Sequence, residues 1–275
     1  MFKKIICLLL FPFCIHASRF DTYYNKYSSE KITDFVVLGE RSSGTKFLSV
    51  LIKDNFEVEN VNREGMHKHF IPWLNVSPRS KIDQNQLTFA ESKSFFKNTS
   101  DVLFIFIVRN PYDWLRSFYN HGWHVPSEIK LCFSSFISET WASTEYEVDD
   151  YNPWTQRPFE NVLELRKYKT LNFLNVNHFV KNFVFVSYED LCDDQKGFIQ
   201  FVAKKFNIKK KKNTVVEDQF IGRDPARVNK TFTKPKYFVP TEEEVSFINK
   251  NLSWDLERSL GYSKLSYQDF INEND

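Results

Sequence analysis

A glycine-rich stretch near the start of the sequence contains the residue types that bind phosphate. Residues 39–48 read GERSSGTKFL, and the spacing of Gly39 and Gly44 is that of the nucleotide-binding pattern G-x-x-x-x-G-K-[ST]. The last two residues are reversed, because Thr45 precedes Lys46. Backbone N–H groups, hydroxyl groups and cationic side chains in one turn are suited to an anion. The candidate anion-binding residues of this loop are Arg41, Ser42, Ser43, Gly44, Thr45 and Lys46.

A second cation follows the most apolar segment of the chain. Residues 102–108 (VLFIFIV) predict a strand covered on both faces, and Arg109 stands at its carboxyl end, where ligands of open α/β sheets bind. Pro111 suits the first turn of a helix, and Ser117 lies within that helix. Arg109 and Ser117 could therefore contact one phosphate. The alternative is that Arg109 only pairs with Asp113.

The elements that must position the first loop are a strand and a helix. Residues 34–38 (DFVVL) are an apolar run that predicts a buried strand, and residues 45–54 carry apolar side chains at helical spacing. The loop would then lie at the amino end of the helix, where open N–H groups and the helix dipole favour an anion. The alternative is an ordinary loop whose serine and threonine side chains cap the helix.

Strands and helices alternate further along the chain. Residues 183–186 predict a third strand and residues 195–206 the helix that follows it. Thr241 opens a last helix with a capping box, and this helix is expected to reach Leu256. The alternation predicts one α/β domain over residues 31–265, with a central parallel β-sheet flanked by helices. Two stretches are expected to be a long loop and a surface turn: residues 141–159 and 209–212.

Taken together, these segments resemble the sulfotransferases that use 3′-phosphoadenosine 5′-phosphosulfate (PAPS). In that family a loop of the type G-x-R-K-G-G-T-R holds the 5′-phosphosulfate, and R-N-P-x-D-x-x-x-S-x-Y grips the 3′-phosphate. Residues 39–46 and 109–119 are similar to these motifs, and residues 186–191 (VSYEDL) are similar to a strand-ending Y-E-D-L segment. The resemblance implies that Arg109 and Ser117 bind the 3′-phosphate and that Tyr188 lies near the adenine.

The resemblance also implies the fold and the chemistry. It implies a P-loop NTPase-like fold and a transferase that moves a sulfuryl group from PAPS to a hydroxyl or amine, without a metal. The family usually has a lysine where this chain has Ser42, so Arg41 or Lys46 is the candidate for that catalytic charge. Relatives place a basic loop over the 3′-phosphate, and its counterparts here are Arg227 and Lys230, with Arg223 beside them.

A histidine is the candidate general base. The segment His67-Lys-His-Phe-Ile-Pro72 is similar to the K-x-H-L-P segment that carries the base in some relatives, and His69 is its better match. The alternatives are a surface histidine, a carboxylate base at Glu64, and a zinc site made with other histidines. The further zinc ligands would be His67, His121 and His124, and the candidates for reading the acceptor are Trp141, Trp154, Arg157 and Arg166.

Composition and the first residues bound the setting. The formal net charge of the 275 residues is +2, which gives no field that favours nucleic acid, so anion binding must be local. Residues 1–17 have the basic, apolar and small-residue parts of a secretory signal peptide. The apolar run is too short to span a bilayer comfortably, and an uncleaved anchor is the weaker alternative. Cleavage of this segment would remove Cys7 and Cys14. Cys132 and Cys192 would remain, either as one disulfide or as two thiols.

The predicted function is therefore PAPS-dependent sulfuryl transfer in the secretory pathway lumen or outside the cell. The acceptor would be a glycan, a peptide or a small molecule, with a carbohydrate or secreted protein favoured. One alternative is a P-loop nucleotide kinase using ATP and Mg²⁺, but the apolar strand ends in Arg109 where an acid would help to hold Mg²⁺. The other alternative is a non-catalytic nucleotide-binding member, motivated by Ser42.

Overall fold

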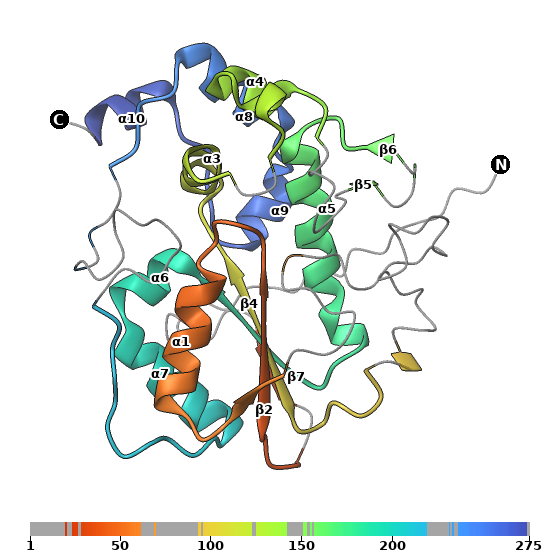
Figure 1. The fold of residues 1–275 in the computed structure, drawn as a ribbon, viewed down its shortest axis with the longest axis vertical. Coiled ribbons are helices and arrows are strands. Elements are labelled where there is room, and N and C mark those ends of the chain that lie inside the picture. The colour runs from red at the N-terminus through yellow and green to blue at the C-terminus, as the bar shows by residue number, and fades with distance from the viewer. Residues whose placement is uncertain are drawn as a thin grey trace.

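The computed structural model describes residues 20, 24–26, 29–61, 69, 93–94, 96–122, 125–141, 151–152, 155, 157–218, 231, 233 and 236–273. Its centre is a five-stranded sheet in the order β1-β7-β4-β2-β3 (Figure 1). The strands are β1 (Tyr24–Lys26), β2 (Asp34–Gly39), β3 (Glu59–Asn60), β4 (Val102–Val108) and β7 (Asn182–Ser187). The neighbours from β7 to β3 run parallel, and only β1 is antiparallel.

The register of the parallel strands brings the predicted site segments to one edge. Gly39 pairs with Ile107 across β2 and β4, and Val108 pairs with Ser187 across β4 and β7. The three strands therefore end side by side, and the residues that follow each of them are neighbours. This places the Gly-rich loop, Arg109 and Tyr188 at the same carboxyl edge of the sheet.

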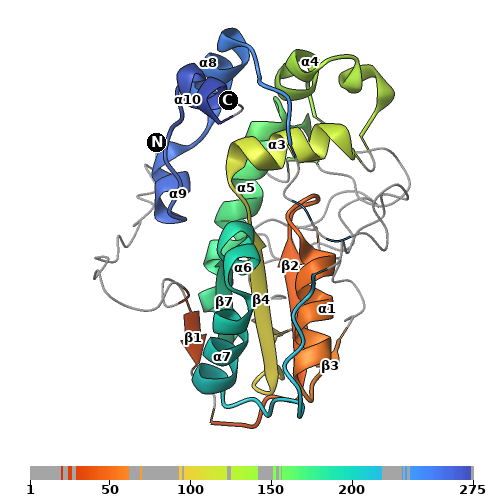
Figure 2. The same cartoon turned by 90° about the vertical axis from the view of Figure 1, so that its left-hand side faces the viewer.

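Helices cover both faces of the sheet (Figure 2). One face carries α1 (Thr45–Asn55), α6 (Tyr188–Asp193) and α7 (Gln195–Phe206), and the other carries α5 (Val162–Leu174) with the 3₁₀ turn η3 (Asn175–His178). Alternate residues of β2 serve the two faces, since Val37 packs toward α1 whereas Val36 packs toward α5. Both faces are apolar, as parallel strands buried on both sides require.

A third layer of helices lies over the carboxyl edge of the sheet (Figure 2). Its core is aromatic, with Trp114, Phe118, Phe136 and Trp141 fully buried. Its elements are α3 (Pro111–Asn120), η2 (Ser127–Lys130), α4 (Phe133–Ser138), α8 (Glu242–Asn251), α9 (Trp254–Ser259) and α10 (Tyr267–Asn272), and a small antiparallel pair is formed by β5 (Tyr151–Asn152) and β6 (Arg157–Pro158). This layer roofs the edge where the predicted anion-binding residues lie.

The predicted α/β domain with a central, mostly parallel sheet is confirmed, but the C-terminal helix is not continuous. The expected helix from Thr241 to Leu256 ends at Asn251, and α9 begins at Trp254. The Trp254 indole N–H donates to the carbonyl of Asn249 (2.8 Å), and this satisfies a helix-end carbonyl from a side chain. The capping box at Thr241 is present as predicted.

The expected loop over residues 141–159 contains more structure than predicted. Trp141 and Phe159 exchange two backbone hydrogen bonds of 2.8 and 3.0 Å, and β5 pairs with β6 between them. The surface turn at residues 209–212 is confirmed as exposed. Cys132 and Cys192 are both free thiols, so they form no disulfide with each other.

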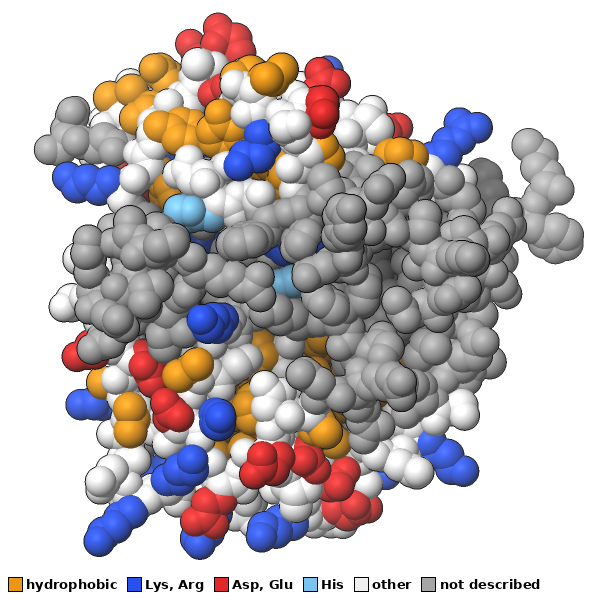
Figure 3. Space-filling view, in the orientation of Figure 1, with side chains coloured by type: hydrophobic (Ala, Val, Ile, Leu, Met, Phe, Trp, Pro, Cys, Tyr) orange, Lys and Arg blue, Asp and Glu red, His pale blue; other side chains and the backbone are white. Residues whose placement is uncertain are grey.

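The described surface carries no single sign of charge on the face seen in Figure 3. Basic and acidic side chains are interspersed over its lower half. Among the residues that the structure describes, none of the helices is both long enough and apolar enough to cross a membrane. The cations Arg41, Arg109, Arg166 and Lys169 are instead buried.

Candidate active site

The loop between β2 and α1 leaves the amino end of α1 open. Gly44 is the N-cap residue with φ 93°, and no side chain among the described residues caps this helix. The interpretation of the loop as a side-chain cap by serine or threonine is therefore wrong. The first N–H groups of a helix have no partner inside the helix, and they form an anion site together with the helix dipole. Ser42 also has a positive φ, of 61°, which is uncommon for a residue with a side chain.

Gly44 lies directly against the residue that follows the third strand. A Cβ atom at Gly44 would be 2.6 Å from Cδ2 of Tyr188, so the glycine is required both by its φ and by this contact. Tyr188 is the first residue of α6, and burial raises the pKa of its phenol well above the ordinary value. The hydroxyl therefore stays protonated. The loop is therefore in direct contact with Tyr188, the residue predicted to lie near the adenine.

We expect Gly44→Ala to disturb the site through both of these constraints. The change should lower the free energy of unfolding by about 1–3 kcal/mol and weaken binding of adenosine 3′,5′-bisphosphate. Gly261→Ala is the matched control, since Gly261 has φ 91° but nothing lies within 4 Å of an added Cβ. Chemical denaturation and calorimetry measure the two effects. Equal affinity of the two variants for the bisphosphate would contradict the assignment of Gly44 to the site.

Arg109 joins the loop to the end of β4 and to the C-terminal part of the chain. Its side chain is buried (5% exposed), and Nη1 donates to the carbonyl of Ser42 at 2.8 Å. Nη2 donates to the hydroxyl of Tyr237 at 2.7 Å, and the guanidinium lies 4.4 Å from the ring centroid of Tyr188. Burial lowers the pKa of Arg109, but the surrounding tyrosines and carboxylates outweigh it and raise the pKa above the ordinary value.

One donor of Arg109 has no acceptor in the part of the chain that the structure describes. The Nε–H group is buried and makes no hydrogen bond there. Buried polar groups are almost always hydrogen-bonded, so an orphaned donor on a buried cation indicates a place for an anionic ligand. The interpretation that Arg109 pairs with Asp113 is wrong, because Asp113 forms its ion pair with Arg116 at 2.5 Å. Ser117 is buried on the same helix, α3.

The other cationic candidates of the loop point in different directions. Arg41 is buried, with Nε 3.5 Å from Oε1 of Glu40 and its guanidinium 5.3 Å from the ring centroid of Phe118. Its carbonyl accepts a hydrogen bond of 2.8 Å from the indole of Trp114. Lys46, in contrast, is exposed on the first turn of α1. Thr45 and Ser43 are buried beside these residues.

His69 approaches the base of the loop. Its Nδ1 lies 2.7 Å from the carbonyl oxygen of Gly39, and this oxygen can only accept. Nδ1 therefore carries the proton, and in the neutral ring Nε2 is the nitrogen that accepts a proton. A hydrogen bond from one ring nitrogen to a carbonyl group commonly fixes which of the two nitrogens of a functional histidine carries the proton.

Several predicted site residues cannot be placed. Those that lie outside the described residues are Glu64, His67, His124, Trp154, Arg223, Arg227 and Lys230. Among the described residues, no group of three His, Cys, Asp or Glu side chains is arranged to hold a metal ion. Of the candidates for reading the acceptor, Arg157 is exposed. Two others are buried and cannot reach an acceptor from the surface. Trp141 is fully buried in the aromatic layer, and Arg166 is buried in an ion pair.

Arg166 forms a buried, bidentate ion pair beneath the site. Its Nε and Nη2 donate to the two carboxylate oxygens of Glu257 at 2.6 and 2.8 Å, and Nη2 also donates to the carbonyl of Arg109 at 2.9 Å. The guanidinium lies 5.1 Å from the ring centroid of Trp114. The pair therefore fixes the backbone of Arg109 from α5 and α9.

We expect Glu257→Ala to be strongly destabilising, because it leaves the Arg166 cation buried without its carboxylate. Breaking a buried pair from one side costs about 3–5 kcal/mol of unfolding free energy. The matched control is Asp255→Ala on the same helix, since the Asp255 carboxylate pairs with Arg258 at the surface and should contribute little. Urea denaturation of both variants tests the difference, and similar midpoints would refute it.

Among the residues that the structure describes, the buried cations at this edge of the sheet outnumber the buried carboxylates that contact them. The cations are Arg41, Arg109, Arg166 and Lys169, and the carboxylates are Glu40 and Glu257. Glu189 lies close by as a third carboxylate, and burial raises its pKa. An excess of buried positive charge is costly unless an anion completes it. The site is therefore suited to a ligand with several negative charges.

Four of the residues that build this site were not singled out from the sequence. Tyr237 contacts Arg109 and Glu257 contacts Arg166 from distant parts of the chain, Glu40 contacts its neighbour Arg41, and Lys169 pairs with Glu40. Glu40 had one visible signal, since an acidic residue directly before an anion-binding loop is unexpected. The other three pair over long sequence separations, which no local pattern reports.

A comparison with protein-family models agrees with this geometry. The model of the sulfotransferase domain matches residues 32–255. The match covers most of the chain, and the chain therefore belongs to the sulfotransferase domain family. It is a sulfotransferase, in which the parallel strands bring the Gly-rich loop and Arg109 to one edge of the sheet. A search of curated proteins found no match.

Proposed function

We propose that the protein transfers a sulfuryl group from PAPS to a hydroxyl or amine of an acceptor. The observation that carries this proposal is Arg109, a buried cation beside the amino end of α1 whose Nε–H group has no acceptor among the described residues. Two separate anion-binding elements at one edge fit a donor with phosphate groups at both the 3′ and 5′ positions. A nucleotide kinase would need only the loop at the amino end of α1, together with an acidic residue that holds a metal ion.

Each residue has a defined task in this proposal. Arg109 and Ser117 bind the 3′-phosphate, and the N–H groups of the loop from Ser42 to Lys46 hold the 5′-phosphosulfate. PAPS supplies the sulfuryl group when bound. Positioning and neutralisation of the charge that develops on the leaving phosphate are the main contributions of the protein. Arg227 and Lys230, which lie outside the described residues, are proposed on the resemblance alone as further contacts of the 3′-phosphate.

The proton of the acceptor hydroxyl must be taken up as the new S–O bond forms. His69 is the proposed base, because its Nδ1–H···O bond to Gly39 leaves Nε2 as the proton-accepting atom at the base of the loop. Arg41 or Lys46 is proposed to replace the charge of the lysine that is usual at position 42. Arg41 is the closer of the two to the buried charges, and Lys46 is the more exposed.

The setting proposed for this reaction is the secretory lumen or the cell exterior. Residues 1–17 have the pattern of a signal peptide, followed by a sulfotransferase domain over residues 31–265. The acceptor class that fits this setting is a carbohydrate or a secreted protein.

Calorimetry on the purified protein tests the donor. We expect adenosine 3′,5′-bisphosphate to bind more tightly than ATP, with no requirement for Mg²⁺. Tighter binding of ATP with Mg²⁺ would overturn the proposal in favour of a nucleotide kinase. Transfer of radiolabelled sulfate from PAPS to a panel of glycans and peptides then tests the reaction. Donor binding without transfer to any member of a broad panel would favour a non-catalytic role.

A further inference from the structure

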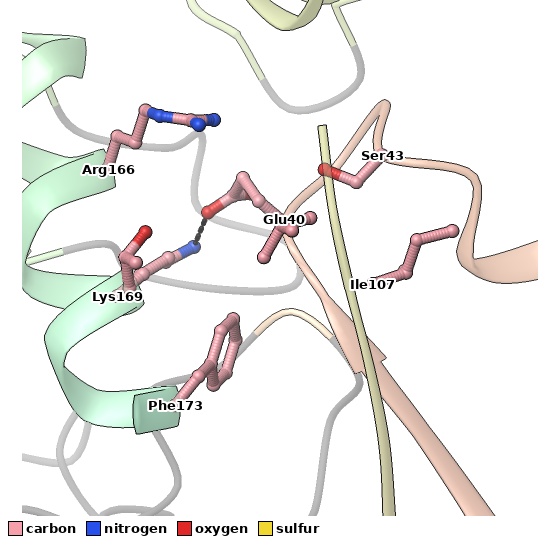
Figure 4. Close-up of a pocket in the computed structure, with 8 residues that line it drawn as sticks. Glu40, Ser43, Ile107, Arg166, Lys169 and Phe173 are labelled. Atoms are coloured by element: carbon pink, nitrogen blue, oxygen red, sulfur yellow. Dashed lines mark ion pairs between the residues drawn. The ribbon is translucent and has the colours of Figure 1, made fainter. Parts of the chain in front are cut away.

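One face of α5 contacts both anion-binding elements. Arg166 and Lys169 are three residues apart and reach from this helix toward the edge of the sheet, as Figure 4 shows. Arg166 donates to the carbonyl of Arg109, whereas Lys169 forms an ion pair of 2.5 Å with Oε2 of Glu40. Residues at this spacing share a helix face. Helix α5 therefore contacts both the end of β4, which carries Arg109, and the loop that begins with Glu40.

Glu40 shapes the loop with both its side chain and its backbone. Oε1 of its carboxylate accepts the N–H of Arg41 at 2.6 Å, and its carbonyl accepts the N–H of Ser43 at 3.2 Å. These two bonds fix the turn that leads into the strained Ser42 and Gly44. A carboxylate in this position has a cost, because it lies beside the N–H groups that would bind an anion.

The environment of Glu40 is buried and contains other charges. Glu40 and Lys169 line a cavity of about 20 Å³, room for about one water, together with Ser43, Arg166 and Thr170. Lys169 is only 2% exposed. Charges interact strongly where water is excluded, so an uncompensated carboxylate here would oppose a bound phosphosulfate. The Arg41 guanidinium lies farther from Glu40, at 3.5 Å, than Lys169 does.

We propose that Lys169 is a positioning residue for the donor: it neutralises Glu40, so that the loop keeps the shape set by this carboxylate and still accepts the 5′-phosphosulfate. This inference rests on the proposed function. It makes α5 part of the donor site, although neither Lys169 nor Glu40 contacts the donor in the proposed arrangement.

The test compares Lys169→Met with the double variant Glu40→Gln/Lys169→Met. Lys169→Met should weaken binding of adenosine 3′,5′-bisphosphate by about tenfold or more, because the Glu40 charge is exposed to the 5′-phosphate. Binding of adenosine 3′-monophosphate, which lacks that phosphate, should change by less than about threefold. The double variant has no charge to neutralise and should bind the bisphosphate within about threefold of the unmodified protein.

Calorimetry and thermal unfolding are measured together on all variants. Lys167→Met is the matched control, since Lys167 is exposed on the same helix and should leave binding unchanged. An equal loss for both ligands, or a double variant as weak as Lys169→Met, would overturn the proposal. If Lys169→Met does not fold, the double variant decides, because failure of its folded form to bind the bisphosphate overturns the proposal. Absence of bisphosphate binding by the unmodified protein would instead refute the proposed function, and this inference with it.

Discussion

Arg109→Ala is expected to weaken binding of adenosine 3′,5′-bisphosphate by about 30- to 1,000-fold, a loss of about 2–4 kcal/mol. The substitution removes a buried cation and the donors that it directs at Ser42 and Tyr237. It also removes the buried Nε–H group that has no acceptor among the described residues. Hydrogen bonds to charged groups are among the strongest that a site can offer. Isothermal titration calorimetry measures the change directly.

Two further variants separate the role of Arg109 in binding from its role in folding. Arg109→Lys keeps the charge but loses the planar guanidinium group. Its affinity for the bisphosphate should fall by about tenfold and lie between those of the unmodified protein and Arg109→Ala. Arg258→Ala removes an exposed arginine from α9 and should leave the affinity unchanged. Thermal unfolding shows whether each variant is folded. A folded Arg109→Ala protein with unaltered affinity would refute the assignment of this residue to the 3′-phosphate.

The parts of the fold that were predicted correctly are those with local causes. Residues 102–108 form a strand because a continuous apolar run buried on both faces can hardly adopt anything else in a parallel sheet. The helix after Arg109 begins as expected because Asn110 accepts N–H groups at its start and Pro111 fits the first turn. The register of the parallel strands then brings the two anion-binding motifs together.

The parts that could not be predicted depend on contacts between distant residues. Arg166 and Glu257 are 91 residues apart, and Arg109 and Tyr237 are 128 residues apart. Arg166 was expected to read the acceptor, because it lies in the middle part of the chain, where the resemblance places acceptor recognition. Its burial follows from the position of α9. One continuous helix had been predicted in place of α8 and α9. The break between these helices is made by a side-chain contact of Trp254, which leaves no periodic signal.

The missing lysine at position 42 is partly explained by the same long-range contacts. Ser42 has a positive φ and gives its carbonyl to Arg109, so its backbone is already used to connect the two anion-binding elements. A left-handed backbone conformation is costly for any residue with a Cβ atom, and a longer side chain at position 42 would not lower that cost. Arg41 brings a buried positive charge to this edge of the sheet, whereas the charge of Lys169 is paired with Glu40. The local motif therefore gave an incomplete account of the charge at the site.

His69→Asn is expected to lower the rate constant of sulfuryl transfer by about 10²–10⁴-fold, the usual contribution of a positioned general base. The change keeps a polar side chain near Gly39. It removes the ring nitrogen that is proposed to accept the proton of the acceptor. The affinity for adenosine 3′,5′-bisphosphate should stay within about threefold, because His69 binds no phosphate in the proposed site. Transfer of radiolabelled sulfate at saturating PAPS, to an acceptor found in the glycan and peptide panel, measures the rate.

The pattern of losses distinguishes a base from a residue that only supports the loop. A base should affect the rate constant alone, whereas a loop support acting through the Gly39 carbonyl should weaken donor binding and transfer together. His178→Asn is the matched control, since His178 is an exposed histidine at the end of η3, and it should leave both quantities unchanged. An unaltered rate in His69→Asn would assign the proton transfer to another group. Glu64→Gln would then be the next variant to measure, because a carboxylate at that position is the alternative base.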